Sequence, residues 1–249
     1  EKYPSVTTAT GWAKRDFFKK WRENPKNKEE SARCLKRGNE FHYIVEDYLQ
    51  NKENFDENRS DTGMLLFEQI KSLLGKIGNI YAQEAPLWSS TLELAGRVDC
   101  VAEYDGELAI IDFKTSTKEK KEEWVENYFL QATAYAIMWH ERTRMPISKI
   151  VILISCDDGA SQVFIKDPMD YVPKMVKNFL SAKLSKGISN KKADVTTKDI
   201  RILSCFGNDK ISPCIHLQAS KIEGGEGKHI CGGCGCGDKK GTWLVSDGD

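Results

Sequence analysis

The dipeptide Asp105-Gly106 separates two runs in which apolar residues dominate, residues 92–104 and 107–113. An aspartate-glycine pair with such flanks is the strongest short-range signal of a β-hairpin with a two-residue turn. A turn of that length also sets the register of the two strands. The sequence therefore predicts two paired strands and, in addition, which of their side chains share a face.

In this register Asp99 of the first strand stands opposite Asp112 of the second. Opposed residues of an antiparallel pair share a face, as do residues two apart along one strand, so Lys114 is expected on that face as well. Three charged side chains would then lie within a few ångströms of one another. The other face is expected to be apolar and to pack against a helix, and it carries Val98, Cys100, Ala102, Ala109, Ile111 and Phe113.

Two opposed carboxylates destabilise a strand pair, and burial would raise the pKa of one of them strongly. A divalent cation removes this conflict, because Mg²⁺ prefers oxygen ligands and is commonly held by one or two carboxylates together with substrate phosphates. Lys114 could then stabilise negative charge on a phosphate or help to lower the pKa of an attacking water. The alternative is a solvated surface ladder of charges, although the apolar run 108–113 indicates that Asp112 is not freely solvated.

The periodicity of apolar residues predicts helices and further strands around the hairpin. The helices are expected at residues 10–21, 29–50, 61–74, 119–144 and 170–183, and the strands at 81–87 (an edge strand ending at Pro86), 149–155 and 162–165. The hairpin's second strand, the fourth helix and the next strand form a β-α-β crossover, whose strands should be parallel. The expected fold class is α/β, a mixed central sheet with helices on both faces.

Charge and hydropathy exclude few functions. The 249 residues include 37 Lys or Arg and 37 Asp or Glu, so the net charge does not indicate a nucleic-acid partner. Residues 1–40 hold eleven basic and six acidic residues, which suits either a solvated surface or a contact with phosphates. No apolar run approaches the roughly 18 residues of a membrane span, and residues 1–10 lack the apolar stretch of a secretory signal. A soluble intracellular protein without membrane contact is expected.

The sequence changes in character near residue 185. Residues 1–185 show clear apolar periodicity and are expected to form one domain, whereas residues 186–249 are rich in glycine and cysteine and are expected to form a small appendage. Five of the eight cysteines fall in the last 45 residues, which is not the even framework of a secreted disulfide domain. A reducing compartment is therefore expected.

Aromatic and basic residues alternate near the N-terminus. The aromatic residues are Trp12, Phe17, Phe18 and Trp21, and the basic residues are Lys14, Arg15, Lys19, Lys20 and Arg22. Such a mixture suits single-stranded DNA, through base stacking and phosphate contacts. The favoured interpretation is an amphipathic helix whose aromatic face is buried and whose basic half remains able to contact phosphates.

Four motifs resemble those of the RecB-like branch of the PD-(D/E)XK nuclease superfamily. In chain order they are Gly38-Asn-Glu-Phe-His42 (G-x-x-x-H), Gly96-Arg-Val-Asp99 (G-x-x-D), Asp112-Phe-Lys114-Thr-Ser (D-x-K-T) and Gln131-Ala-Thr-Ala-Tyr135 (Q-x-x-x-Y). The resemblance covers roughly residues 3–184. Within the branch the chain is similar to the mitochondrial genome maintenance exonucleases and to related phage exonucleases, and it is expected to share their restriction-endonuclease-like core.

The resemblance implies roles for individual residues. His42 is expected to bind the metal together with Asp99, Asp112 and the backbone carbonyl of Phe113. Gln131 is expected to orient Lys114 or to contact the substrate. Further residues are expected to support the site or bind substrate: Glu46, Glu84, Thr115 and Tyr135. Glu84 could alternatively reach the metal.

The C-terminal segment carries a second hypothesis. Cys231, Cys234 and Cys236 form a tight group of soft ligands, with Cys214, His216 and His229 upstream. A Cys-x-x-Cys knuckle can place two thiolates on one Zn²⁺, so zinc is the preferred candidate. An iron–sulfur cluster that also uses Cys34, as in Cas4-type RecB-like nucleases, and a segment without metal remain alternatives.

Together these observations predict an exonuclease that depends on Mg²⁺ or Mn²⁺ and hydrolyses phosphodiester bonds of single-stranded or frayed DNA. A structure-specific endonuclease with the same site and a non-catalytic DNA-binding module are the alternatives. The intact set of Asp99, Asp112 and Lys114 argues against the non-catalytic module. The likeness to phage proteins raises a viral origin, with action in a bacterial cytoplasm, as a hypothesis.

Overall fold

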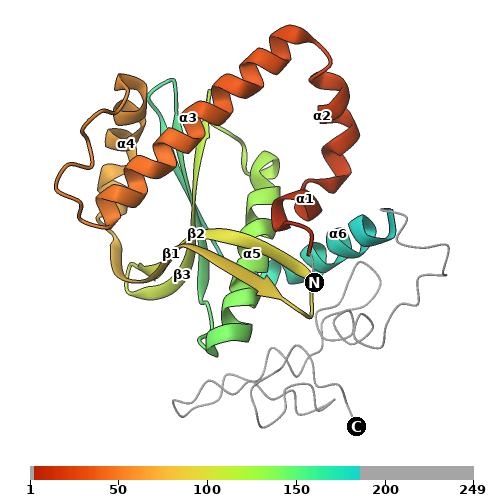
Figure 1. Ribbon diagram of the computed structural model, residues 1–249. Helices are drawn as coiled ribbons and strands as arrows, with labels where there is room; N and C mark the ends of the chain where they lie inside the picture. Colours follow the sequence, from red (N-terminus) through yellow and green to blue (C-terminus); the bar gives the residue numbers. More distant parts are fainter. Residues whose placement is uncertain (1–2, 186–249) are drawn as a thin grey trace.

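The computed structural model describes residues 3–185, apart from the side chains of Ala13 and of residues 180–185. One five-stranded sheet has the order β1-β2-β3-β4-β5 (Figure 1). Its strands are β1 (Ile77–Ser89), β2 (Leu94–Tyr104), β3 (Glu107–Ser116), β4 (Lys149–Cys156) and β5 (Ser161–Lys166). Among the described strands, β3 and β4 alone pair in parallel, and they are joined by a helix, so the predicted mixed sheet and crossover are confirmed.

Residues 3–185 contain six α-helices. They are α1 (Val6–Thr10), α2 (Arg15–Trp21), α3 (Pro25–Leu49), α4 (Asp61–Leu74), α5 (Glu122–Thr143) and α6 (Val172–Ser185), with 3₁₀ turns at Trp12–Lys14 and Pro168–Asp170. Among the described residues, no helix combines the length and the apolar composition that crossing a membrane requires.

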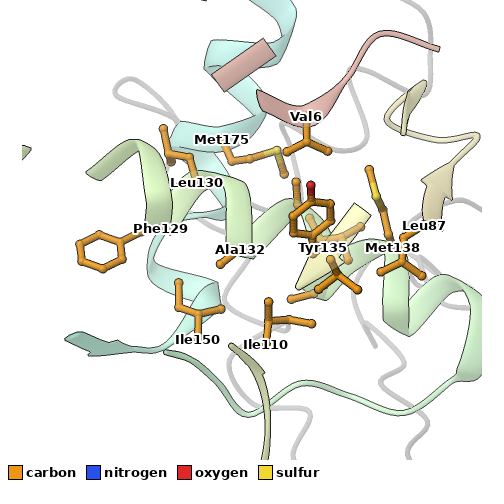
Figure 2. Packing of buried hydrophobic residues seen from close by; sticks show 14 of the residues in the cluster. Val6, Leu87, Ile110, Phe129, Leu130, Ala132, Tyr135, Met138, Ile150 and Met175 are labelled. Atoms are coloured by element: carbon orange, nitrogen blue, oxygen red, sulfur yellow. The ribbon is translucent and has the colours of Figure 1, made fainter. Parts of the chain in front are cut away.

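Two apolar cores lie on opposite faces of the sheet. One joins α1, α5 and α6 to the strands, and Figure 2 shows Val6 of α1 and Met175 of α6 close to Tyr135 of α5. The other core packs α3 and α4 against the sheet through residues such as Phe41 and Phe67. Because α5 is covered by both the sheet and its neighbouring helices, its buried positions form an almost continuous run from Phe129 to His140.

The hairpin register is confirmed where β2 and β3 pair. The turn residues Asp105 and Gly106 have φ of 49° and 77°, which is the left-handed conformation that an Asp-Gly turn of this type requires. Tyr104 pairs with Glu107, and the recorded pairs continue to Cys100 and Ile111. Beyond that point β2 stays paired with β1 and β3 stays paired with β4. The two strands therefore separate into a fork.

Asp99 and Asp112 lie at this fork, one position beyond the last recorded pair of β2 and β3. Because the strands separate there, the expectation for the apolar face fails at one residue. Val98 faces the α5 side. The other residues of the predicted apolar face point toward α3 and α4 as expected: Cys100, Ala102, Ala109, Ile111 and Phe113. The in–out alternation of β2 thus changes phase around Asp99, which strand periodicity alone does not reveal.

Several predicted boundaries were wrong. The single helix expected at residues 10–21 is broken: α1, capped by Ser5, ends at Thr10, a 3₁₀ turn follows, and α2 begins only at Arg15. Helix α3 begins four residues earlier than expected, at Pro25, with Asn24 as its N-cap. Strand β1 is longer at both ends and continues through Pro86, which an edge strand tolerates because one side of it donates no ladder hydrogen bonds.

Three of the four N-terminal aromatic residues, Phe17, Phe18 and Trp21, are exposed, contrary to the favoured interpretation, and Trp12 is half-buried. Helix α2 has no buried residue, and Phe17 is 65% and Phe18 43% exposed. Helix α3 buries its first residue only at Arg37. Figure 1 shows α2 and the first half of α3 standing away from the sheet. We call residues 15–21 and 25–36 the α2–α3 arm.

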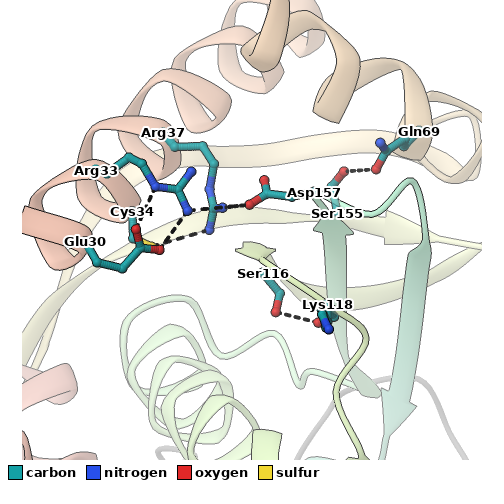
Figure 3. A network of polar contacts seen from close by, with 9 residues as sticks. All are labelled: Glu30, Arg33, Cys34, Arg37, Gln69, Ser116, Lys118, Ser155 and Asp157. Carbon is teal, nitrogen blue, oxygen red and sulfur yellow. Dashed lines mark hydrogen bonds and ion pairs between the residues drawn. The ribbon is translucent and has the colours of Figure 1, made fainter. Parts of the chain in front are cut away.

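A network of ion pairs holds the base of this arm to the sheet (Figure 3). Arg37, which is 8% exposed, pairs with Asp157 directly after β4. The backbone N–H of Asp157 donates to the carbonyl of Ser116, the last residue of β3, at 2.9 Å. Arg33 and Glu30 extend the network along α3, with a nitrogen–oxygen distance of 2.7 Å. Helix α3 is thereby attached at the carboxyl ends of β3 and β4.

Candidate active site

Three side chains from three different elements meet at the fork: His42 of α3, Glu84 of β1 and Asp99 of β2. One ligand atom from each residue lies within 4.8 Å of the others. His42 Nδ1 is 3.7 Å from Asp99 Oδ2 and 3.9 Å from Glu84 Oε1. A group of two carboxylates and one imidazole at such distances is suited to holding a divalent cation.

Glu84 enters this group through an unusual backbone conformation. Its φ is 46°, although it lies within β1 and is not a glycine. Its neighbours Gln83 and Ala85 pair with Cys100 and Val98, so Glu84 stands beside Asp99 of β2. A left-handed residue inside a strand costs of order 1–3 kcal/mol and persists only where surrounding structure enforces it. Such strain is commonly found at functional sites.

The two carboxylates alter the acid–base behaviour of His42. Burial alone would lower the pKa of the imidazole, but Glu84 and Asp99 outweigh burial and raise it. The site thus attracts positive charge, either as a proton on His42 or as a cation between the three residues. Asp99 is held in place by the backbone N–H of Phe113, which donates to its Oδ2 at 2.9 Å.

Asp112 and Lys114 of β3 form a buried ion pair next to this cluster. Asp112 is 1% exposed, and its Oδ2 lies 2.5 Å from Lys114 Nζ. Burial, with a further contribution from Asp99, raises the pKa of Asp112 to about 6, although Lys114 opposes the shift. Burial disfavours the charge on Lys114, but Asp112 and Asp99 outweigh it and raise the lysine's pKa.

The Asp112 carboxylate is otherwise poorly satisfied. Within residues 3–185, neither of its buried oxygens accepts a hydrogen bond of regular geometry, and Lys114 is its ion-pair partner. Buried carboxylates normally have several partners. A cation bound between Asp112 and Asp99 would supply the missing interaction, so the residues present fit a divalent metal.

Helix α5 contributes further side chains next to the Asp112–Lys114 pair. Tyr128 places its ring centroid 5.3 Å from Lys114 Nζ, a cation–π distance. Gln131 and Tyr135 follow on the same helical face and are buried. Burial, reinforced by Asp112, raises the pKa of Tyr135 to about 12, which the neighbouring Gln131 partly offsets. Tyr128 was missed from the sequence, although its position three residues before Gln131 on one helical face was a usable signal.

A model of one protein family matches most of this chain. The match covers residues 57–237, and the family is described as the PD-(D/E)XK nuclease superfamily. The chain belongs to the PD-(D/E)XK nuclease superfamily. The restriction-endonuclease-like core expected from the motifs is thereby confirmed. The fork between β2 and β3 carries Asp99, Asp112 and Lys114, the residues predicted from the sequence to form the superfamily's motif.

Curated relatives of this PD-(D/E)XK protein include mitochondrial genome maintenance exonuclease 1 from three vertebrates. The human protein is 34% identical over 114 residues, which is 43% of this chain and 32% of the human protein. The Xenopus tropicalis protein is 31% identical over 139 residues, 53% of this chain and 39% of that protein. The chain thus spans well under half the length of these relatives. The hypothesis of a viral origin finds no support in them.

Two residues predicted to support the site, Glu46 and Thr115, lie around it rather than in it. The Glu46 carboxylate accepts a hydrogen bond from Gln50 at 3.1 Å, while the Glu46 carbonyl accepts from Gln83, the neighbour of Glu84. Thr115 lies against α3, and a Cβ added to Gly38 would be 3.7 Å from its hydroxyl oxygen.

The carbonyl of Phe113 accepts a long hydrogen bond from Lys114 Nζ at 3.4 Å, so both groups face the same region.

The C-terminal ligand candidates Cys214, Cys231, Cys234 and Cys236 lie outside the described residues. The family match continues to residue 237, and the division at residue 185 stays a prediction.

Proposed function

We propose that this PD-(D/E)XK protein is a DNA exonuclease that requires Mg²⁺ or Mn²⁺ and hydrolyses phosphodiester bonds of single-stranded DNA or free ends. One observation carries the proposal. The cluster of His42, Glu84 and Asp99, whose ligand atoms are close enough to hold a metal ion, lies beside the buried Asp112–Lys114 pair. The similarity to proteins named exonucleases supports the same activity.

The metal would be held by His42, Asp99 and Asp112, with the carbonyl of Phe113 and with Glu84 as an additional oxygen ligand. When bound, it supplies Lewis-acid polarisation of a phosphoryl oxygen and a lowered pKa for water. The chain's own contribution is to orient the ligands. Asp99 is locked by the backbone of Phe113, and the conformation of Glu84 turns its carboxylate toward His42.

Lys114 supplies a fixed positive charge for the phosphate. Its ammonium group is confined between Asp112 and the ring of Tyr128, so little rearrangement is needed when negative charge builds up on the substrate. Gln131 supports this arrangement from α5. The side-chain exposure of Lys114 is 19%, which leaves the ammonium group within reach of a bound phosphate.

The preference for single strands is supported by the α2–α3 arm. Its aromatic residues Phe17, Phe18 and Trp21 are exposed, and basic residues surround them. Bases of a single strand are available for stacking on such rings, whereas bases of a duplex are already stacked on one another. The arm is attached beside the site through Arg37 and Asp157, so a strand lying on it could enter the fork.

The activity test uses single-stranded DNA labelled at one end, with Mg²⁺ or Mn²⁺ and with EDTA. Lys114→Ala and Asp112→Asn are expected to lower the cleavage rate by about 10²-fold or more. The matched control is Lys71→Ala on α4, an exposed lysine paired with Glu68. Cleavage by both site variants at the wild-type rate would refute the proposed site.

Two further substrates and one binding measurement separate the alternatives. A circular single strand is cut by an endonuclease and resists an exonuclease. Retention of labelled DNA without any cleavage by the wild type would indicate a non-catalytic binding module. A matching RNA strand distinguishes a deoxyribonuclease from a nuclease that accepts both polymers.

We further propose that residues 1–185 form the nuclease domain and that residues 186–249 hold a metal, with zinc as the preferred ion. The support is the Cys231-Gly-Gly-Cys234 knuckle together with Cys236 and Cys214. Metal analysis of the purified full chain tests this. One equivalent of zinc that is lost in Cys231→Ser supports the proposal, and iron indicates an iron–sulfur cluster. The absence of both metals from the purified protein refutes the proposal.

A further inference from the structure

Four side chains of α5 form a single stripe that leads out of the candidate active site. Trp124, Tyr128, Gln131 and Tyr135 are spaced at three or four residues, so they share one helical face. Gln131 and Tyr135 are buried, Tyr128 is half-buried, and Trp124 is 56% exposed. The stripe therefore runs from the buried interior of the site to the surface.

The stripe also sets a distance from the site. The Tyr128 ring lies 5.3 Å from Lys114 Nζ, the group placed to face the phosphate. Trp124 is one helical turn further along α5, which is about 6 Å along the helix axis. Successive nucleotides of one strand are about 3.4 Å apart when stacked and further apart when extended. Together the two distances amount to about 11 Å, which corresponds to about three stacked nucleotides, or fewer extended ones, between Trp124 and a phosphate held at Lys114.

The charges around Trp124 suit a polyanion. Lys121 Nζ lies 5.6 Å from the centroid of the Trp124 ring. Two of the acidic neighbours are paired with lysines, because Glu122 pairs with Lys166 of β5 at 2.6 Å and Glu126 pairs with Lys174 of α6. Glu123 is exposed and has no ion pair within residues 3–185. An exposed indole with a lysine beside it combines a stacking surface with a cation for the phosphate.

We propose that Trp124 stacks on the base of a nucleotide within about three positions of the scissile phosphate, with Lys121 contacting the adjoining backbone. The occupant is a nucleic-acid strand, and stacking accepts any of the bases because each has a π-face. This subsite rests on the proposed nuclease function and adds a strand-positioning contact to it. It would hold the strand end in register with Lys114.

The experiment compares Trp124→Leu, Trp124→Phe and a matched control, Trp88→Leu. Trp88 is also an exposed tryptophan beside a cation, with Arg142 at 4.0 Å, but it contacts the last turn of α5 instead of the first. KM and kcat are measured on single-stranded oligonucleotides, and Kd is measured with Ca²⁺ in place of Mg²⁺. Thermal unfolding verifies that all three variants remain folded.

Trp124→Leu is expected to raise KM and Kd about tenfold, while Trp124→Phe and Trp88→Leu stay near the wild type. Oligonucleotides with one abasic position then identify the stacked base. The wild type should lose about tenfold in affinity at one position near the cleaved end, and Trp124→Leu should lose nothing further there.

Equal KM and Kd for Trp124→Leu and the wild type would overturn the subsite, as would an abasic penalty that persists in the variant. Both results are distinct from a failure of the proposed function itself. If the proposed function fails, the wild type neither binds nor cleaves DNA, and the subsite is refuted together with the nuclease activity.

Discussion

Gly96 of β2 lies directly against Tyr135 of α5. A Cβ at position 96 would be 2.6 Å from the tyrosine hydroxyl oxygen and 2.8 Å from its Cε1. The glycine of the G-x-x-D motif thus contacts the tyrosine of the Q-x-x-x-Y motif, and this contact packs α5 against β2 beside the fork. Real Cβ contacts are essentially never this short, so one of the two elements would have to move for any larger residue.

Gly96→Ala is therefore expected to destabilise the protein by about 1–3 kcal/mol, because Tyr135 is buried and has no free space to enter. Chemical denaturation measures the loss. Gly38→Ala is the matched control. Its Cβ would make only ordinary contact at 3.7 Å within helix α3, so stability should hold or rise by up to about 1 kcal/mol. Equal effects at the two glycines would contradict the contact.

The Arg37–Asp157 pair predicts a second stability effect. Removing one partner leaves a buried charge, so Asp157→Ala should cost about 3 kcal/mol. Arg37→Met removes the positive charge of the pair while keeping the side chain's bulk. The double variant Arg37→Met/Asp157→Ala should lose less stability than the sum of the losses in the two single variants. Additive losses in a double-mutant cycle would show that the pair does not couple α3 to the sheet.

Glu40 predicts a dependence of stability on pH. Its carboxylate accepts from the backbone N–H of Ser60 at 2.6 Å and from the Ser60 hydroxyl at 2.8 Å, at the N-cap of α4. The backbone hydrogen bond, followed by the hydroxyl, holds the pKa of Glu40 below its ordinary 4.5. A lowered folded pKa gives stability that is present above the unfolded pKa and is lost as the pH falls through the folded value.

Glu40→Gln should therefore cost roughly 1 kcal/mol at pH 7, and the difference from wild type should shrink as the pH falls below about 4.5. Denaturation at a series of pH values measures it. Glu53→Gln, at an exposed glutamate, serves as the control and should show no such trend. A difference between Glu40→Gln and wild type that stays constant down to pH 3 would contradict the predicted linkage.

The cluster of His42, Glu84 and Asp99 predicts a stability effect whose sign depends on metal. Mg²⁺ or Mn²⁺ at about 100 times Kd should stabilise the wild type by about 2.7 kcal/mol, raising Tm by about 5–10 °C. Glu84→Gln removes one of two neighbouring negative charges. Without metal, its Tm should equal or exceed that of the wild type.

With metal, Glu84→Gln should lie below the wild type, because a ligand has been lost. Glu46→Gln is a suitable control, since its carboxylate is bonded to Gln50 outside the cluster. Differential scanning fluorimetry over a metal titration follows both variants. Identical metal-induced shifts for Glu84→Gln and the wild type would exclude Glu84 as a ligand.

Much of this site could be predicted from local sequence patterns. The Asp-Gly turn and the alternation that follows it led to the correct register of Tyr104 with Glu107, because turn length and strand period are local properties. The same reasoning placed Asp112 and Lys114 on one face of β3, where they form their ion pair. The parallel pairing of β3 with β4 followed from the strand–helix–strand order, which forms a β-α-β crossover.

Other features required contacts between distant segments. The exposure of Phe17 contradicts an amphipathic pattern that is normally buried, because burial depends on whether another element covers that face. The aromatic spacing in α2 would be the same whether that face were buried or exposed. The phase change at Val98 likewise depends on where β2 leaves β3 for β1, which its own alternation does not encode.

By itself, the sequence determined the hairpin and the Asp112–Lys114 pair, since both follow from neighbours close along the chain. Only the tertiary structure decided that Glu84 turns toward His42 and that Tyr128 lies beside Lys114. Those contacts join residues that are 42 and 14 positions apart, on elements that meet only when both faces of the sheet are packed. Packing restricts such pairs through the shape of the whole domain, whereas turns and strand periods act within a few residues.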